Sequence, residues 1–407
     1  MNGFQALPVD AALQRTPELE QIAATRPNSL ILHDLGVCYF TTGYPEKALC
    51  VLETAWKKNR NPSIALSMGL VLKELGRHEE SLEMLELAYC SAPEDDYIRL
   101  GYSEGLLKAG FWKQAWPIYD NARPTQQAAA IDLRLSLGVR EWNGSPLGAH
   151  QKLLVINEGG TGDRFSYARW LPELTKLGID WVFYPYEELF SFYERIFPRE
   201  RLVKDGEQIV PDPTHWVTTF ALPAKLGATP NTVPPPLPFT ALPGAIEKFK
   251  TNRPDSLPVV GICYQAAEQH QGGLKIRSLT EGQAMRLVCM TGDRIHWVSL
   301  QHGKTMPYPV MNLPAIAEGK ATWEDTAGLI RNLDAVVSVD TSIMHLAGAM
   351  RKPLYVPLSG NSCWKFLKTG TKCVWYPTAR LIRNQGRGFE NAVDQLIGAI
   401  RNGPTLL

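Results

Sequence analysis

The chain has 407 residues, more than a single compact core usually holds, which favours two or three domains. A hydrophobic content of 44% and a charged content of 20% exclude a fibrous or largely disordered chain. With 42 basic and 41 acidic residues the formal net charge is +1, so no overall field attracts nucleic acid or an anionic membrane.

The N-terminus and the cysteines both fit a cytoplasmic protein. The first residues, MNGFQALPVDAALQRTPELE, lack a basic start followed by a long apolar core, so we expect no signal peptide. No apolar run approaches the roughly 20 residues that span a bilayer. The 7 cysteines are odd in number and never spaced Cys-x-x-Cys, which favours buried free thiols over disulfides or a zinc site.

Residues 30–127 contain a sequence repeat. Three related units begin at Leu35, Met68 and Gly101: LGVCYFTTGYPEKALCVLETA, MGLVLKELGRHEESLEMLELA and GYSEGLLKAGFWKQAWPIYDNA. Their equivalent glycines lie 33 and 34 residues apart, at Gly43, Gly76 and Gly110. Small residues recur at Ala48, Ser81 and Ala115, and again at Ala55, Ala88 and Ala122. Each unit predicts a helix, a glycine turn and a second helix, with the period of tetratricopeptide repeats.

We expect residues 1–138 to form an all-α domain built on these repeats. One helical hairpin cannot bury its apolar face alone, so the units should stack into a short solenoid with a concave face. That face can bind a peptide or a partner protein; a spacer or folding scaffold is the alternative.

Beyond Arg140 the pattern changes to alternating strands and helices. KLLVI, Lys152 to Ile156, predicts a strand; a glycine-rich turn and a helix follow, and IDWVFYPY predicts a second strand. The proline cluster in ATPNTVPPPLPFTALPG predicts an extended connection. We therefore expect a first α/β lobe over residues 139–245.

A second α/β lobe is predicted over residues 246–385. Its expected strands are PVVGICYQ, HWVSLQ, AVVSVD and PLYVPL, and its expected helices are EGQAMRLVCM, WEDTAGLIRNL and SIMHLAGAM. The tail, residues 386–407, contains a final amphipathic helix, ENAVDQLIGAIRN.

A polar cluster follows the predicted strand AVVSVD. Asp340 ends the strand, Thr341 or Ser342 is placed to cap the next helix, and His345 falls in its first turn. Ligands bind beyond the carboxyl ends of strands in open parallel sheets, and helix N-termini attract anions. The cluster suits a phosphate or diphosphate. Alternatively, Asp340 and Thr341 only cap a core helix and His345 bonds to backbone.

The turn after the first strand of the other lobe is a second candidate. It reads Gly159, Gly160, Thr161, Gly162, Asp163, and glycines let backbone approach a ligand closely. The spacing matches neither dinucleotide-binding nor P-loop motifs. Asp163 can act as a general base if a substrate hydroxyl lies within reach, or it is simply a favourable charge at a helix start.

Two further strand exits carry polar residues. Lys275 and Arg277 can neutralise a diphosphate without a metal, or they are solvated loop cations. Gln301, after the strand HWVSLQ, can read a nucleobase together with backbone groups. We find no acidic pair spaced to hold a metal, and we expect Asp340 to hold a ribose or the helix start.

The ordered motifs resemble glycosyltransferases of the bacterial lipopolysaccharide heptosyltransferase type, in the form fused behind tetratricopeptide repeats. The matching pieces are WNGSPLGAHQKLLVINEGGTGDRFSYARWLPELTKLG, VGICYQ, IRSL, WVSLQHG, DTAGLIRNLDAVVSVDTSIMHLAGAMRKPLYVPLS and WYPTARLIR. The resemblance implies a GT-B fold, with two Rossmann-like lobes, an active cleft between them and a last helix that crosses back to the first lobe.

The resemblance also implies roles for single residues. Asp163 matches the family's catalytic base, and Asp340, Thr341 and His345 match its nucleotide-diphosphate site. Lys275 and Arg277 lie where the family places cations for the donor phosphates. The chain departs from the family at Glu158-Gly159-Gly160, at Ser166 and Tyr167, and in SGNSCWKF, which lacks an aspartate before its tryptophan.

We therefore predict transfer of a sugar from a nucleotide-diphosphate-sugar donor to a hydroxyl acceptor, by direct displacement that needs no metal or cofactor. The acceptor is left open between a protein, a peptide and a glycan. A nucleic-acid acceptor is not favoured, because basic residues are not clustered with aromatic ones. Two alternatives stay open: a catalytically inactive binding module, and a two-lobed nucleotide-sugar epimerase.

Overall fold

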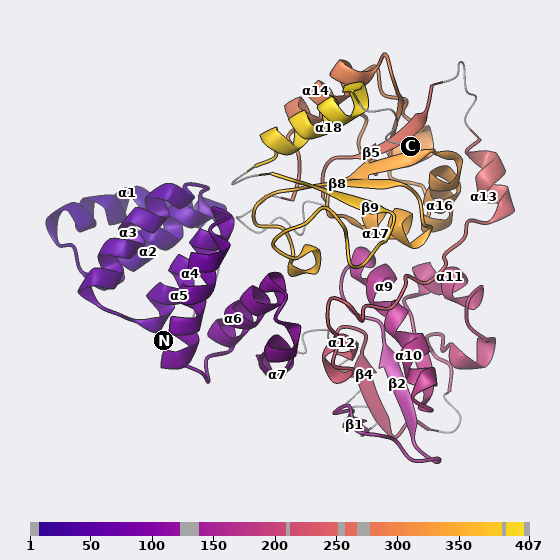
Figure 1. Cartoon of the computed structure of the whole chain (residues 1–407), viewed down its shortest axis with the longest axis horizontal. Helices are drawn as coiled ribbons and strands as arrows, with labels where there is room; N and C mark the ends of the chain where they lie inside the picture. The colour runs from indigo at the N-terminus through magenta and orange to yellow at the C-terminus, as the bar shows by residue number, and fades with distance from the viewer. Residues whose placement is uncertain are drawn as a thin grey trace.

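The computed structural model describes residues 8–122, 138–208, 212–250, 257–266, 277–384 and 388–402. The chain forms three parts, an N-terminal helical part and two α/β lobes (Figure 1). Within the described residues, no helix combines the length and the apolar composition that crossing a membrane requires.

The helical part consists of antiparallel helix pairs, as the repeat predicted. After α1 (Val9–Thr25), the pairs are α2 (Ser29–Thr41) with α3 (Pro45–Lys58), α4 (Pro62–Glu74) with α5 (His78–Ser91), and α6 (Asp96–Ala109) with α7 (Trp112–Ala122). The three equivalent glycines end the first helix of each pair with φ of 90° at Gly43, 75° at Gly76 and 92° at Gly110. Residues other than glycine rarely adopt this left-handed backbone conformation, which explains why glycine recurs at this position.

Small residues let the helices of each pair approach closely. Ala48, Ala55, Ala88 and Ala115 are fully buried, and a Cβ added to Gly36 would lie 2.6 Å from Leu52 Cγ. The predicted tetratricopeptide-like repeats are thus confirmed for the part of residues 30–127 that the structure describes, which ends at Ala122.

The first lobe is a four-stranded parallel sheet in the order β1-β4-β2-β3. Its strands are β1 (Arg140–Glu141), β2 (Lys152–Ile156), β3 (Asp180–Tyr184) and β4 (His215–Thr218), and its helices are α9 (Thr161–Tyr167), α10 (Leu171–Lys176), α11 (Phe190–Glu194) and α12 (Leu222–Lys225). The predicted strands β2 and β3 are confirmed. The single helix expected after the glycine turn is instead α9 and α10, joined by a short 3-10 turn.

The second lobe is a five-stranded parallel sheet in the order β6-β5-β7-β8-β9. The strands are β5 (Val259–Cys263), β6 (His296–Ser299), β7 (Ala335–Ser338), β8 (Leu354–Leu358) and β9 (Ala379–Arg383). The helices are α13 (Pro243–Lys248), α14 (Glu281–Thr291), α15 (Pro314–Ala317), α16 (Trp323–Asn332), α17 (Ser342–Ala349) and α18 (Glu390–Asn402). Two parallel α/β lobes behind a helical repeat domain are the predicted fold class.

The last helix does not return to the first lobe, so that expectation is wrong. The apolar face of α18, including Val393 and Leu396, packs in one cluster with Ile262 of the second sheet. Arg286 of α14 also bonds to Asp394 at 2.6 Å. The amphipathic tail finds its apolar partner within its own lobe, and therefore covers that sheet.

A different element connects the second lobe to the rest of the molecule. We call residues 359–378, between β8 and β9, the β8–β9 segment. Trp364 and Trp375 of this segment belong to one buried apolar cluster with Trp112 of α7 and Leu171 of the first lobe. The repeats and both lobes therefore share a core.

All seven cysteines are free thiols, as predicted, but their burial is mixed. Cys38, Cys263 and Cys373 are buried and Cys363 is half-buried, whereas three are exposed: Cys50, Cys90 and Cys289. The expectation of general burial is wrong for the exposed three, which lie on the outer faces of amphipathic helices.

Candidate active site

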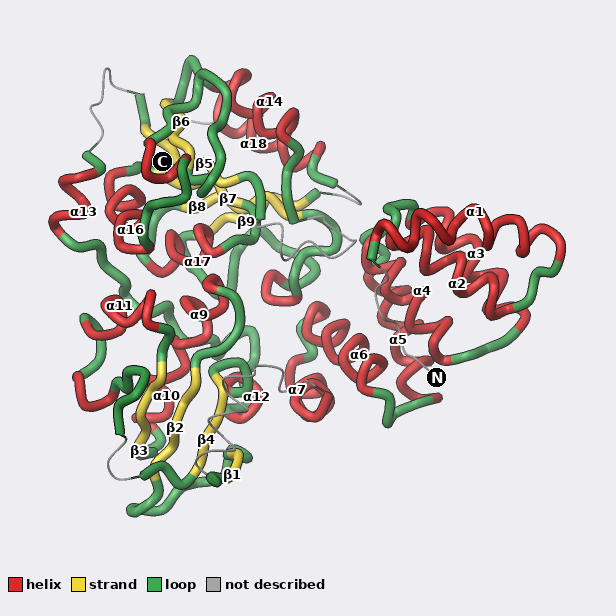
Figure 2. Tube along the Cα trace, turned by 180° about the vertical axis from the view of Figure 1, so that it is seen from behind, coloured by secondary structure: helices red, strands yellow, loops and turns green. Residues whose placement is uncertain are grey.

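The carboxyl ends of the two sheets face each other. In Figure 2, α9, which follows β2, and α17, which follows β7, lie between the two sheets. In the first sheet the chain runs from β2 to β3 on one side and to β4 on the other, and in the second sheet β5 has β6 and β7 as neighbours. At β2 and at β5 the order of the strands thus reverses direction. Open parallel sheets bind ligands at such reversals, beyond the carboxyl ends of the strands.

The glycine turn fits the close approach of the lobes. A Cβ added to Gly162 would lie 2.6 Å from His345 Cδ2 and 3.2 Å from Ser342 Cα. Gly159 has φ of 88°, and a Cβ there would lie 2.5 Å from Phe220 Cζ. Gly160 precedes α9 with extended backbone, and Thr161 begins that helix. The turn therefore needs glycine at Gly159 for conformation and at Gly162 for contact between the lobes.

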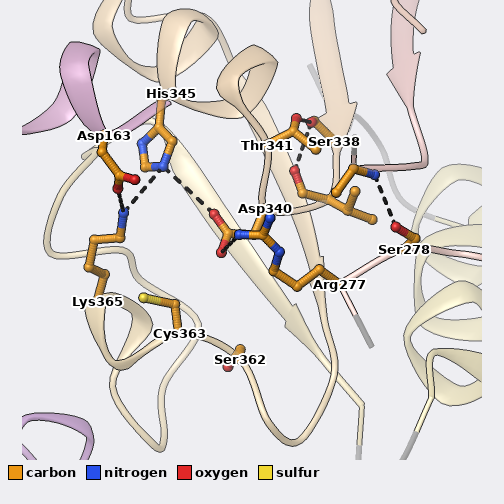
Figure 3. Close-up of polar contacts among 12 residues, drawn as sticks. Asp163, Arg277, Ser278, Ser338, Asp340, Thr341, His345, Ser362, Cys363 and Lys365 are labelled. Carbon is orange, nitrogen blue, oxygen red and sulfur yellow. Dashed lines mark hydrogen bonds and ion pairs between the residues drawn. The ribbon is translucent and has the colours of Figure 1, made fainter. Parts of the chain in front are cut away.

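A line of charged and polar side chains crosses the junction (Figure 3). Lys365 Nζ, from the β8–β9 segment, donates to Asp163 Oδ1 at 2.8 Å and lies 3.5 Å from His345 Nε2. His345 Nε2 lies 3.7 Å from Asp340 Oδ1, and Arg277 Nη1 lies 3.9 Å from Asp340 Oδ2. The structure thus brings together four of the residues singled out in the sequence, and adds Lys365.

These side chains differ in exposure and in charge state. Lys365, His345 and Asp340 are buried, with 5%, 3% and 8% of their surface exposed. Burial by itself raises the pKa of Asp340, but contact with His345 and the charges of Lys365 and Arg277 outweigh it and lower the pKa to about 2. Burial lowers the pKa of Lys365, but Asp163 and the other acidic groups around it raise that pKa well above its usual value. Asp340 and Lys365 therefore both stay charged.

His345 is held as a neutral ring. Burial, followed by the charge of Lys365, lowers its pKa, and the two aspartates only partly oppose this. Its Nδ1 lies 2.9 Å from the hydroxyl of Tyr376, which also comes from the β8–β9 segment. Its Nε2 lies between Lys365 Nζ, which can only donate, and the carboxylate of Asp340, which can only accept.

The start of α17 differs from the expected cap. Thr341 occupies the capping position, but its hydroxyl makes no capping hydrogen bond. It pairs instead with Ser338 Oγ at 3.0 Å and with Cys263 Sγ at 3.7 Å. The backbone amides that open this helix are therefore not capped by Thr341, and amides at a helix start attract anions.

Gln301 and Lys275 are the remaining residues predicted for the donor side. The amide of Gln301 accepts from Gln265 N at 3.0 Å and donates to Gln265 O at 3.1 Å, so it fastens the exit of β5. Its reading of a nucleobase stays a prediction. Lys275 falls outside the described residues.

Lys365 and Tyr376 were not singled out as site residues in the sequence. Lys365 stands in SGNSCWKF and Tyr376 in CVWYPT, neither of which has a helical or strand period. The only available signal was position: both follow β8, whose carboxyl end lies at the same sheet edge as that of β7. Within the described ranges, no three His, Cys, Asp or Glu side chains gather as metal ligands would.

Comparison with known proteins finds a family match over one part of this site. Residues 310–374 match the family model described as glycosyltransferase family 9 (heptosyltransferase). Protein FlbA of Caulobacter vibrioides is 24% identical over 363 residues, which cover 81% of this chain. The chain spans 59% of the length of that relative.

The chain also aligns with solved structures, at TM-scores below 0.5. A family 9 glycosyltransferase from Veillonella parvula aligns with a TM-score of 0.42 and 10% identity, covering 60% of this chain and 88% of its own. An ADP-heptose lipopolysaccharide heptosyltransferase II of E. coli aligns with a TM-score of 0.38 and 12% identity, covering 61% and 98%. The resemblance found in the sequence is thus confirmed over residues 310–374, the segment with Asp340, His345 and Lys365, which matches glycosyltransferase family 9.

Proposed function

We propose that this chain is a glycosyltransferase that moves a sugar from a nucleoside-diphosphate-sugar donor to a hydroxyl acceptor. The observation that carries the proposal is the line from Asp163 through Lys365 and His345 to Asp340, formed where the two sheets end face to face. The match of residues 310–374 to glycosyltransferase family 9 supports the same reaction class.

The second lobe supplies the donor side in this proposal. The leaving diphosphate gains negative charge as its bond to the sugar breaks, and preorganised positive groups stabilise such charge most effectively. Two kinds of positive group lie at this junction. They are the side chains of Lys365 and Arg277, and the backbone amides at the start of α17, at Thr341 and Ser342, which have no side-chain cap. Side-chain cations thus take the part that a metal ion plays in other transferases, so we propose metal-independent transfer.

The first lobe supplies the base. The side chain of Asp163 is 33% exposed, whereas that of its partner Lys365 is 6% exposed. One carboxylate oxygen is held by Lys365, and the exposed part of the group can accept a proton from an acceptor hydroxyl. The acceptor oxygen then bonds to the anomeric carbon while the bond from that carbon to the diphosphate oxygen breaks. A protein, peptide or glycan acceptor remains the proposed partner class.

A thermal-shift experiment with purified protein tests the donor site. ADP, GDP, UDP and CMP, and sugar conjugates of the first three, are added separately at millimolar concentration. A ligand that binds only the folded state raises the melting temperature by mass action. We expect one nucleoside diphosphate and its sugar conjugate to give the largest shift.

Two histidine variants provide the comparison. His345→Ala should abolish the shift, whereas His150→Ala, at an exposed histidine of the first lobe, should keep it. Each shift is measured against the melting temperature of the same variant without ligand. If no nucleotide shifts the wild-type protein, or if both variants behave alike, the proposed donor site is wrong.

A further inference from the structure

We infer that the third repeat is part of the active site, because Lys108 of α6 positions the β8–β9 segment so that Lys365 reaches Asp163. From the sequence, the role of the repeat domain was undecided between binding a peptide or partner protein and acting as a spacer or folding scaffold. The contacts below give it a direct role in the geometry of the site. The consequences for nucleotide binding rest on the proposed function; the positioning itself does not.

Lys108 is a buried lysine, and its hydrogen bonds to residues that the structure describes all go to one turn of the segment. Only 4% of its surface is exposed, and its Nζ donates to Ser362 Oγ at 2.6 Å, Ser362 O at 2.7 Å and Cys363 O at 3.4 Å. An ammonium has three protons to donate, and a buried one is costly unless they find acceptors. Burial, with the nearby charge of Arg383, lowers the pKa of Lys108 to about 7.

Other contacts from the repeats hold the same part of the segment. Asn361 Nδ2 donates to Glu74 Oε2 at 2.7 Å, and Lys368 Nζ lies 2.8 Å from Glu79 Oε1. The indole of Trp364 packs edge-on against those of Trp112 and Trp116, with ring centroids 5.4 and 5.7 Å apart. The repeats therefore touch the segment before, at and after the turn that carries Lys365.

This turn sends neighbouring side chains in opposite directions. Trp364 and Lys365 both lie in a 3-10 turn, Trp364–Phe366, yet Trp364 packs on the repeats while Lys365 pairs with Asp163 and lies over the ring of Tyr167 at 5.5 Å. The next residue, Leu367, has φ of 56°, which a leucine adopts only where surrounding contacts enforce it. In Figure 3, Ser362 and Cys363 lie in the same loop as Lys365. A displaced turn would therefore move Lys365 as well.

A double-mutant cycle on the full chain tests whether Lys108 acts through Lys365. The four proteins are wild type, Lys108→Met, Lys365→Met and the double variant. Binding is measured for ADP, GDP and UDP and for the matching monophosphates. We expect Lys108→Met to weaken binding of the preferred diphosphate about tenfold and that of its monophosphate much less. In the Lys365→Met background, Lys108→Met should have no further effect, because coupled residues are not additive.

Controls separate positioning from general damage. Lys113→Met, at an exposed lysine of α7, should bind like wild type. Ser362→Ala removes one acceptor of Lys108 and should give a smaller effect in the same direction, which keeps the test valid if Lys108→Met does not fold. Wild-type affinity in Lys108→Met, or effects that add in the double variant, would overturn the inference.

Hydrogen exchange tests the positioning without any nucleotide. Amides of residues 359–368 should exchange faster in Lys108→Met than in Lys113→Met, while those of β5 and β7 stay unchanged. Faster exchange together with no nucleotide binding by wild type would sink the proposed function and leave the positioning role of Lys108. Unchanged exchange in the segment would rule out that role, whatever the protein binds.

Discussion

The two lobes each place a carboxylate just beyond an inner strand of a parallel sheet, but they surround it differently. Asp163 follows β2, and its side chain is 33% exposed, with Lys365 as its ion-pair partner. Asp340 follows β7, and its side chain is 10% exposed, with both His345 and Arg277 within 4 Å. The first carboxylate is reachable, whereas the second is enclosed by positive and polar groups.

This difference assigns different work to the two acids. A carboxylate that takes a proton from a substrate must be within hydrogen-bond reach of it. A carboxylate whose pKa is lowered to about 2 stays ionised at all ordinary pH values and acts as a fixed charge. We therefore expect chemistry to depend on Asp163, and stability and alignment to depend on Asp340.

The largest expected effect is that of Asp163→Asn. The amide keeps the shape of the side chain but cannot accept the acceptor proton, so transfer should fall by about 10² to 10⁴. Release of nucleoside diphosphate from the donor measures the rate, and nucleotide affinity should change by less than about threefold. Asp212→Asn, at an exposed acid of the same lobe, serves as the control. Equal rates for the two variants would remove Asp163 from the role of base.

A smaller effect is expected where the two lobes touch. The added methyl of Gly162→Ala would lie 2.6 Å from His345 Cδ2 and 3.2 Å from Ser342 Cα, and the ring is held in place by Tyr376. Overpacking of this kind costs about 1–3 kcal/mol of unfolding free energy. Urea unfolding should show this loss, but not for Gly148→Ala, where the nearest atom lies 3.6 Å away. Equal stability of the two variants would mean that the lobes are not closely packed in solution.

The third prediction concerns acid stability. Since the pKa of Asp340 is about 2 in the folded chain and 3.8 is its ordinary value, its ionised form stabilises the fold above about pH 4. The contribution, about 2 kcal/mol, is lost as the pH falls from about 4 to about 2. The difference in unfolding free energy between wild type and Asp340→Asn should therefore shrink over that range. A difference that does not change with pH would contradict the charged environment of Asp340.

Much of the fold follows from local patterns. The repeat period, the glycine positions and the alternation of strands and helices predicted α2 to α7 and the strands β2, β3 and β5 to β8. Three strands were missed. Arg140–Glu141 and His215–Thr218 have too few residues to show a period, and Ala379–Arg383 alternates only in part between apolar and basic residues and was not recognised as a strand. The place of α18 was also missed, since an amphipathic helix shows which face is apolar but not which surface will cover it.

The residues of the candidate site also fall into two groups, those that local sequence predicted and those that it did not. Asp163, Asp340 and His345 stand directly beside strand ends or helix starts, where the sequence shows both the element and the polar residue. Lys365 and Lys108 have no such marker. Lys365 lies in an irregular segment, and Lys108 is one lysine in an amphipathic helix.

The three parts of the protein, the strand ends that carry the acids and the family resemblance could all be predicted from local sequence, because each depends on residues close together in the chain. The partners of those acids could not, because they come from distant parts of the chain. Lys365 lies 202 residues from Asp163, and Lys108 lies 254 residues from Ser362. Such pairs form only when the sheets, the repeats and the β8–β9 segment have packed together, since burial and approach, not local pattern, select which charges meet.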